Sequence, residues 1–278
     1  MEVSLITLCE NTAGRTDVLA EWGLSILVEV DGLKLLLDTG YGISTVHNAV
    51  TLDVNLKEVQ KIVLSHGHAD HTGGLREVLR RTGRIEIIAH PDIWASKYVS
   101  RPGEEHHTYI GIPFQPEELE RLGAFSSLSE HPVWITDDIV TTGEIPMVVP
   151  YETIDSNLYV KDGDNLVPDP LADDQALVIK ANFGLVVVLG CAHRGLINTL
   201  KYAREITGVD DVYAIIGGTH LFRADEERIE RTIADLKEIG VQKLGVSHCT
   251  SFFASARLAQ EFADSFFLNN AGTRLTLP

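Results

Sequence analysis

The sequence has few cysteines and no long apolar run, and each shortage excludes a class of protein. Its 278 residues include three cysteines, Cys9, Cys191 and Cys249, an odd number without a pairing pattern. We therefore expect no disulfide framework and a reducing compartment, the cytoplasm. No apolar run is long enough to span a bilayer, and the opening stretch MEVSLITLCEN lacks the pattern of an export signal. A protein without a membrane partner is the expectation.

Basic residues are also too few for a general nucleic-acid binder. The chain has 23 Lys and Arg against 40 Asp and Glu, a formal net charge of −17. Neutralising phosphates needs a basic face, so no nucleic-acid partner is expected. An anionic small-molecule substrate is not excluded, because bound divalent ions and a few arginines can make one pocket positive. Glycine loops of the Walker or dinucleotide type are absent as well.

The strand and helix patterns predict one α+β domain over residues 1–278. Predicted strands lie at 3–9, 24–30, 33–38, 61–65, 85–89, 176–181, 185–190, 212–217, 243–247 and 266–269, and predicted helices at 16–22, 73–82, 196–206, 225–239 and 251–263. Each half begins with strands and continues with α/β units, which suggests helices outside two facing sheets. Residues 98–150 hold six prolines and only short predicted strands near 133–135 and 138–142, so we expect an irregular insertion of loops and hairpins of the kind that forms lids.

The stretch VLSHGHADHTGGL, residues 63–75, crowds four metal-binding side chains into six positions. They are His66, His68, Asp70 and His71, on the loop between an apolar strand and a predicted helix. Ligand sites commonly lie at the carboxyl ends of strands in α/β sheets. In an extended stretch His66 and His68 point the same way, and the chain then turns Asp70 and His71 towards a second point. This pattern predicts a metal site.

Three later strands end in the same manner and supply further candidates. LVVVLGCAHRG, YAIIGGTHL and KLGVSHCT place His193, His220 and His248 at strand ends. We expect His193 and His248 to be ligands, whereas His220 is either a ligand or a pocket residue that contacts substrate. Cys191 is either an anionic bridging ligand or a small buried residue, since zinc deprotonates a bound thiol.

Two carboxylates and two arginines complete the candidates. Asp38 in LLLDTG either orients a ligand histidine or only forms a turn. Asp174 is a further candidate carboxylate. Arg194, at the start of a predicted helix, and Arg223 are candidates for binding an anionic substrate, or else solvated surface charges. The remaining histidines, His47, His90, His106, His107 and His131, lack a strand-end context and are expected mostly at the surface.

The motif His66-x-His68-x-Asp70-His71, with Asp38 in LLLDTG and the late His248, resembles the metallo-β-lactamase superfamily. The resemblance implies an αββα sandwich of two mixed sheets, with two divalent ions bound between them. It assigns one ion to His66, His68 and His193 and the other to Asp70, His71 and His248. Zinc is the expected metal, with manganese or iron as alternatives.

A narrower resemblance comes from GCAHRGLINTL, GGTHLFRADEERIERTI and the closing AGTRLTL. These stretches are similar to a subfamily of metal-dependent hydrolases named for synthesis of 7,8-dihydropterin-6-ylmethyl-4-(β-D-ribofuranosyl)aminobenzene 5′-phosphate, a step in methanopterin formation. Three features depart from the pattern. The usual middle histidine of the superfamily has no clean equivalent before residue 190, so either His193 takes that place or the site holds one firmly bound metal and one weakly bound metal. Cys191 stands where the superfamily usually has a bridging aspartate. Trp22 stands where similar sequences often have histidine, so the resemblance leaves open whether this position contacts the substrate or a metal ligand.

The resemblance implies a metal-dependent hydrolase that attacks an anionic, phosphorylated small molecule with a hydroxide held between the metals. The alternative is the synthase, a transferase in which an aryl carbon or amine displaces pyrophosphate. A di-iron oxidoreductase is disfavoured, because such members usually carry glutamate where this chain has His68. A non-catalytic metal-binding scaffold is the remaining class. Association of identical chains is left open.

Overall fold

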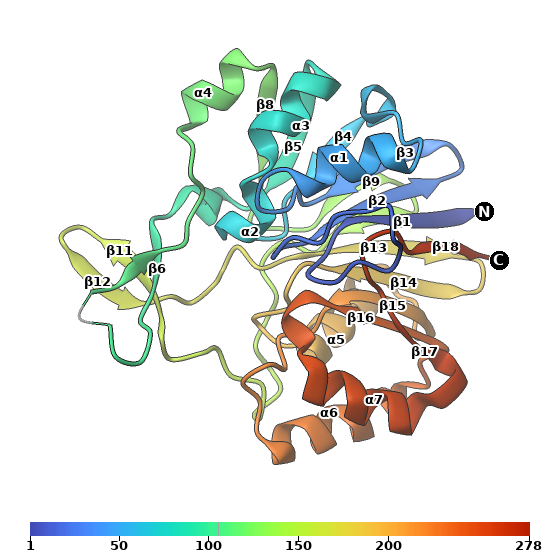
Figure 1. Ribbon diagram of the computed structural model, residues 1–278. Coiled ribbons are helices and arrows are strands. Elements are labelled where there is room, and N and C mark those ends of the chain that lie inside the picture. The colour runs from blue at the N-terminus through green and yellow to red at the C-terminus, as the bar shows by residue number, and fades with distance from the viewer. Residues whose placement is uncertain (105) are drawn as a thin grey trace.

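Residues 1–104 and 106–278, which the computed structural model describes, form two seven-stranded sheets packed face to face and one small sheet beside them (Figure 1). The first sheet has the spatial order β18 (Arg274–Leu277), β1 (Val3–Cys9), β2 (Ser25–Val30), β3 (Leu33–Leu37), β4 (Lys61–Val63), β5 (Ile85–Ala89) and β8 (Ala124–Leu128). The second has the order β17 (Phe266–Leu268), β16 (Lys243–Ser247), β15 (Val212–Gly218), β14 (Gly184–Leu189), β13 (Ala176–Ala181), β10 (Ile139–Thr141) and β9 (Val133–Thr136).

Helices cover the outer face of each sheet. The first sheet carries α1 (Ser44–Thr51), α3 (Leu75–Thr82) and α4 (Pro116–Arg121), and the second carries α5 (Leu196–Thr207), α6 (Glu226–Ile239) and α7 (Phe252–Phe262), as Figure 1 shows above and below the sheets. The short α2 (Ala69–Thr72) lies at the edge of the first sheet. The predicted αββα sandwich is confirmed. No helix among the described residues combines the length and the apolar character that crossing a membrane requires.

The apolar strands bury both of their faces. Successive side chains of a strand point to opposite faces of its sheet. Val186 and Val188 of β14 belong to the core between the two sheets, and Val187 belongs to the core under the outer helices. Burial on both faces explains why these strands are continuous apolar runs without polar alternation.

Parallel strands direct their carboxyl ends to one edge of the sandwich. β3, β4, β5 and β8 pair in parallel in the first sheet, and β14, β15, β16 and β17 do so in the second. The remaining strands pair antiparallel, and β1 and β18 bring the two chain termini side by side (Figure 1). The loops after β3, β4, β14, β15 and β16 carry the strand-end candidates, which therefore meet at that edge.

The structure corrects several predicted elements. Residues 16–22 form no helix, and β18 was not predicted as a strand. The helix predicted at 73–82 begins only at Leu75, because Gly73 and Gly74 pack against the backbone of residues 39–41. A Cβ on Gly74 would lie 2.0 Å from the carbonyl oxygen of Thr39, so the close approach requires glycine.

The irregular insertion is smaller than predicted. Within residues 98–150, β8, β9 and β10 belong to the large sheets. The part that stands apart is the small sheet of β12 (Asn165–Pro168), β11 (Leu158–Asp162), β6 (Lys97–Val99) and β7 (Thr108–Tyr109), which projects from the sandwich at the left of Figure 1. Glu105, inside the predicted insertion, lies outside the described residues.

A buried ion triad joins this small sheet to the sandwich. Lys97 of β6 is 1% exposed, and its Nζ lies 2.9 Å from both Asp169 Oδ2 and Asp173 Oδ1. The other carboxylate oxygen of Asp173 accepts a hydrogen bond from the backbone N–H of Gly67, inside the loop that carries the candidate ligands. Lys97 therefore supports both the small sheet and the ligand loop.

The substitution Lys97→Met is expected to destabilise the fold by about 3–5 kcal/mol, because it leaves two buried carboxylates without a cation. Urea unfolding followed by circular dichroism measures this loss. The matched control is Lys237→Met, whose ion pair with Glu261 is exposed and whose loss should change stability by less than about 0.5 kcal/mol. Equal effects of the two substitutions would contradict a supporting role for the triad.

Candidate metal centre

Three histidines from three places in the sequence converge at the edge of the sandwich. His66 and His68 follow β4, and His193 follows β14 of the other sheet. His66 Nε2 lies 3.0 Å from His68 Nδ1 and 3.2 Å from His193 Nε2. Two nitrogen ligands of one tetrahedral zinc ion lie about 3.3 Å apart. The three nitrogens therefore have the spacing of ligands to a single ion.

The protonation of these histidines also fits a metal. All three side chains are buried, and this burial, together with repulsion between the rings, lowers their pKa values well below that of free histidine. Metal ions bind the neutral imidazole. Ser65 Oγ lies 2.9 Å from His66 Nδ1, on the side away from the cluster, and holds that ring in place.

A second group forms beside the first from Asp70, His71 and His248. His248 Nε2 lies 3.2 Å from both His71 Nε2 and Asp70 Oδ2. The outward nitrogens are held by acceptors: His71 Nδ1 lies 2.7 Å from Asp38 Oδ2, and His248 Nδ1 lies 2.9 Å from Asn11 Oδ1. Such contacts fix the tautomer of a metal-binding histidine. The structure thus assembles both predicted ligand groups, and their metal binding stays a prediction.

Cys191 lies between the two groups. Its Sγ is 3.2 Å from His71 Nε2, and the sulfur also forms a metal-sized group with His66 and His71. Burial, reinforced by Cys249, raises the pKa of the Cys191 thiol well above its usual range. A thiol bound to zinc loses its proton outright. The position of Cys191 fits the bridging role that was weighed against a merely buried cysteine.

The Asp38 carboxylate holds two neighbouring residues of the cluster, Ser65 and His71. Its Oδ1 accepts the backbone N–H of Ser65 at 2.7 Å, and its Oδ2 accepts the hydroxyl of Ser65 at 2.6 Å as well as His71. Although burial disfavours a charged imidazole, the carboxylates of Asp38 and Asp70 raise the pKa of His71 to about 9. Asp38 is therefore an orienting residue rather than only a turn former.

The backbone at the cluster is strained in several places. Asp38, Ala192, His220 and His248 have φ values of 57°, 56°, 49° and 53°, in the left-handed region that non-glycine residues rarely adopt. Each such residue costs on the order of 1 kcal/mol or more, and such strain concentrates at functional sites. The left-handed backbone conformation directs these side chains and their neighbours into the cluster. The ligand atoms are therefore positioned before any ion binds.

Several contacts to the ligands were missed by sequence reasoning. Glu10 accepts the backbone N–H of His248 at 2.7 Å, and Trp22 Nε1 donates to Asp70 Oδ2 at 3.0 Å. Trp22 thus contacts a proposed metal ligand at a position where the sequence had left such a contact open. Cys249 Sγ lies within 4.8 Å of the ligand atoms of Cys191 and His248. The only sequence signal for Cys249 was its place next to His248.

His220 lies at the rim, between the first ligand group and an outer pocket. Its ring centroid is 3.9 Å from that of His193, and its Nε2 is 3.4 Å from Asp155 Oδ2. Although burial disfavours the charged form, the hydrogen bond with Asp155 raises the pKa of His220 to about 9. Both earlier alternatives, ligand and pocket residue, remain compatible with this position.

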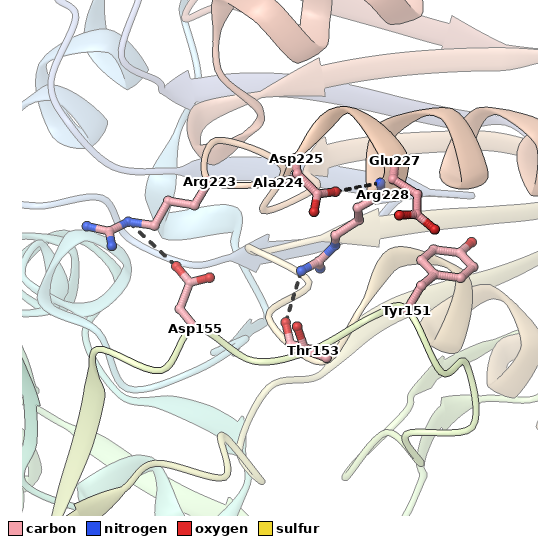
Figure 2. Close-up of a pocket in the computed structure, with 8 residues that line it drawn as sticks. All are labelled: Tyr151, Thr153, Asp155, Arg223, Ala224, Asp225, Glu227 and Arg228. Carbon is pink, nitrogen blue, oxygen red and sulfur yellow. Dashed lines mark hydrogen bonds and ion pairs between the residues drawn. The ribbon is translucent and has the colours of Figure 1, made fainter.

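Figure 2 shows the outer pocket, a cavity of about 310 Å³ at the start of α6. Arg223 Nε lies 3.7 Å from Asp155 Oδ2, and Arg228 donates to the carbonyl of Thr153 at 3.0 Å. The Arg223 side chain is 43% exposed, and Figure 2 shows its guanidinium extending past Asp155 and away from Arg228.

Comparisons with known proteins agree with this geometry. The family model of the metallo-β-lactamase superfamily matches residues 23–157. A 7,8-dihydropterin-6-methyl-4-(β-D-ribofuranosyl)-aminobenzene-5′-phosphate synthase of Methanocaldococcus jannaschii is 35% identical over 280 residues, covering 97% of this chain and 95% of the relative. The chain belongs to the metallo-β-lactamase superfamily.

Two further relatives extend the comparison. An uncharacterized protein of Methanocaldococcus jannaschii is 30% identical and covers 91% of this chain and 93% of its own. The crystal structure of Tm1679, described as a metal-dependent hydrolase of the β-lactamase superfamily, matches with a TM-score of 0.85, 25% identity and 98% of both chains covered. Within the superfamily, this chain combines the histidine and aspartate cluster with a cysteine, Cys191, between the two groups.

The expected substrate contact of Arg194 is wrong. The Arg194 side chain is buried, with its guanidinium bound to the carbonyl oxygens of Ile145 and Pro170 and paired with Glu144. The start of α5 does not offer these N–H groups to a substrate either, because Ile197 and Asn198 donate theirs to the Glu152 carboxylate. The protein's own carboxylate thus occupies the position proposed for a substrate anion.

Two other expectations need correction or refinement. His90 is buried rather than at the surface, and its Nδ1 accepts the backbone N–H of Asp92. Asp174 lies in none of the metal-sized groups that the described residues form. Its Oδ2 accepts the backbone N–H of Arg194 at 2.9 Å, and burial raises its pKa to about 7. Asp174 therefore positions the strand-end loop that carries His193.

Protein purified without added metal is expected to carry about two divalent ions per chain, and His66→Ala should lower this to about one or fewer, because His66 contacts both groups. Inductively coupled plasma mass spectrometry measures the content. The exposed His131→Ala is the matched control and should retain the wild-type content. Unchanged metal in His66→Ala would contradict the proposed ligand set.

Proposed function

We propose that this protein is a two-metal enzyme of the metallo-hydrolase type that acts on an anionic, phosphorylated small molecule. The observation that carries the proposal is the convergence of two ligand groups, His66, His68 and His193 beside Asp70, His71 and His248, with Cys191 between them. Mixed nitrogen, oxygen and sulfur donors at this spacing favour zinc, and manganese or iron are the alternatives.

The charge of the loaded centre supports an anionic substrate. Among the proposed ligands, only the Asp70 carboxylate and a Cys191 thiolate are negative, and two divalent cations exceed that charge. The pocket would then be locally positive, although the protein as a whole has a formal net charge of −17. Bound divalent ions would supply Lewis acidity at a phosphoryl oxygen and lower the pKa of water.

The protein's own groups would hold the substrate and its protons. Asp38 fixes the tautomer of His71, and Trp22 fixes the orientation of Asp70. Against the effect of burial, the hydrogen bond with Asp155 raises the pKa of His220 to about 9, which favours the charged ring, and its buried Nδ1 has no partner among the described residues. We assign that N–H to a phosphate oxygen of the substrate, with the exposed Arg223 as a second contact at the rim.

The second candidate function is that of the synthase relative. It is favoured by the 35% identity that extends over nearly the whole of both chains. In this version the same centre would stabilise a departing pyrophosphate while an aryl carbon or amine attacks the pterin methyl carbon. The two candidates share the site and differ in the nucleophile, water in the first and an aromatic acceptor in the second.

Incubation of the metal-loaded protein with a dihydropterin-methyl pyrophosphate in ¹⁸O-labelled water distinguishes the two. Attack by water at phosphorus is expected to release ¹⁸O-labelled phosphate without any acceptor, as seen by mass spectrometry and ³¹P NMR. The synthase instead releases unlabelled pyrophosphate, and only when ribofuranosylaminobenzene 5′-phosphate is added. His68→Ala is the inactive control. No release under either condition, from protein that holds two metals, would contradict both versions with this substrate class.

A further inference from the structure

A second cleft, of about 510 Å³, opens beside the second ligand group, against His248. Trp22, Phe222 and Phe252 line it, and these residues are 59%, 43% and 79% exposed. Its volume lies in the range of small-molecule pockets, about 300–1,000 Å³. Exposed aromatic residues gathered in one hollow mark a binding site more strongly than the same residues scattered singly.

The polar groups in the wall of this cleft are already engaged within the chain. Both carboxylate oxygens of Glu10 accept backbone N–H groups, those of His248 and Thr12, at 2.7 Å. The Asn11 side chain binds Gly23 N–H and both the ring and the carbonyl of His248. Next to His248 the cleft therefore offers aromatic faces rather than a free carboxylate or amide, which favours a flat, apolar part of a ligand there.

Trp22 connects this cleft to the metal centre. Its ring centroid lies 5.3 Å from that of His248, and its Nε1 donates to Asp70 Oδ2. A ring stacked on Trp22 would thus lie next to two proposed ligands of the second ion.

We propose that the cleft binds a planar aromatic part of the substrate, stacked on Trp22 and enclosed by Phe222 and Phe252. The phosphate of the same molecule would lie at the metal centre. Trp22 and Phe252 are then residues that determine specificity for aryl over alkyl substrates. The inference rests on the proposed function, because it places the second part of the same substrate.

The test compares two phosphonates, whose carbon–phosphorus bond neither hydrolysis nor transfer cleaves, on the metal-loaded protein. Isothermal titration calorimetry is expected to show 1-naphthylphosphonate binding about tenfold more tightly than propylphosphonate, a gain on the order of one stacked ring. In Phe252→Ala this preference should fall to about twofold or less, while propylphosphonate binds as before. In Trp22→Ala the ratio of the two affinities should fall as well, and only the ratio is compared there, because Trp22 also holds Asp70.

Two variants control for other effects. Phe253→Ala removes a neighbouring ring that is 83% exposed but does not line the cleft, so it should keep the tenfold preference. Trp22→Phe keeps a ring and removes the N–H that binds Asp70, so it should keep most of the preference. Metal content, measured on each variant, shows whether a loss of binding comes from a loss of ions.

Equal binding of the two phosphonates by the wild type would overturn the inference, and so would equal losses in Phe252→Ala and Phe253→Ala. A dimer that both Phe variants convert to monomer, with phosphonate binding unchanged, would instead identify the cleft as a contact between copies of the chain. Failure of both phosphonates to bind also overturns it. That failure on a protein with two bound metals would also contradict the proposed function, which places a phosphate at the metal centre, whereas equal binding of the two phosphonates overturns only the cleft assignment.

Discussion

The candidate centre depends on one buried carboxylate, that of Asp38. It is fully buried at the end of β3, where it binds the backbone and hydroxyl of Ser65 and the ring of His71. Gly190 of the opposite sheet packs against this group, and a Cβ there would lie 2.0 Å from Ser65 Oγ. Asp38 therefore fixes a ligand ring and sets how closely the two sheets approach at the site. A buried charge persists only when it is so fully hydrogen-bonded.

Much of the ligand set could be predicted from the sequence, because its signals are local. The crowded stretch around His66 and the histidines that follow apolar strands each indicate a strand end, and parallel strands bring such ends together. The contacts that support the ligands were not predictable in this way. Glu10 and Asn11 reach His248 across more than two hundred residues, and nothing near them in the sequence indicates that partner. Arg194 shows the opposite error, since its buried carbonyl partners lie in distant loops.

The fold was predictable to the same extent and for the same reason. Strands buried on both faces are long apolar runs, so the alternating elements after residue 176 stand out in the sequence. Strands that are defined by pairing with a distant part of the chain do not stand out in the sequence. β18 pairs with β1 at the other end of the chain, and β8 was hidden in a proline-rich stretch that looked irregular. The helix predicted at 16–22 is absent for a related reason. Trp22, at the end of this segment, donates a hydrogen bond to Asp70, a distant residue of the ligand loop.

Anomalous diffraction from crystals of the protein, recorded at the absorption edge of the metal it carries, tests the two-metal centre most directly. The convergence of the ligand groups predicts two peaks about 3.5–4 Å apart. One should lie beside His66, His68 and His193 and the other beside Asp70, His71 and His248, with Cys191 Sγ in contact with both. A single peak, or an ion held by Cys191, Cys249 and His248 instead, would contradict that centre.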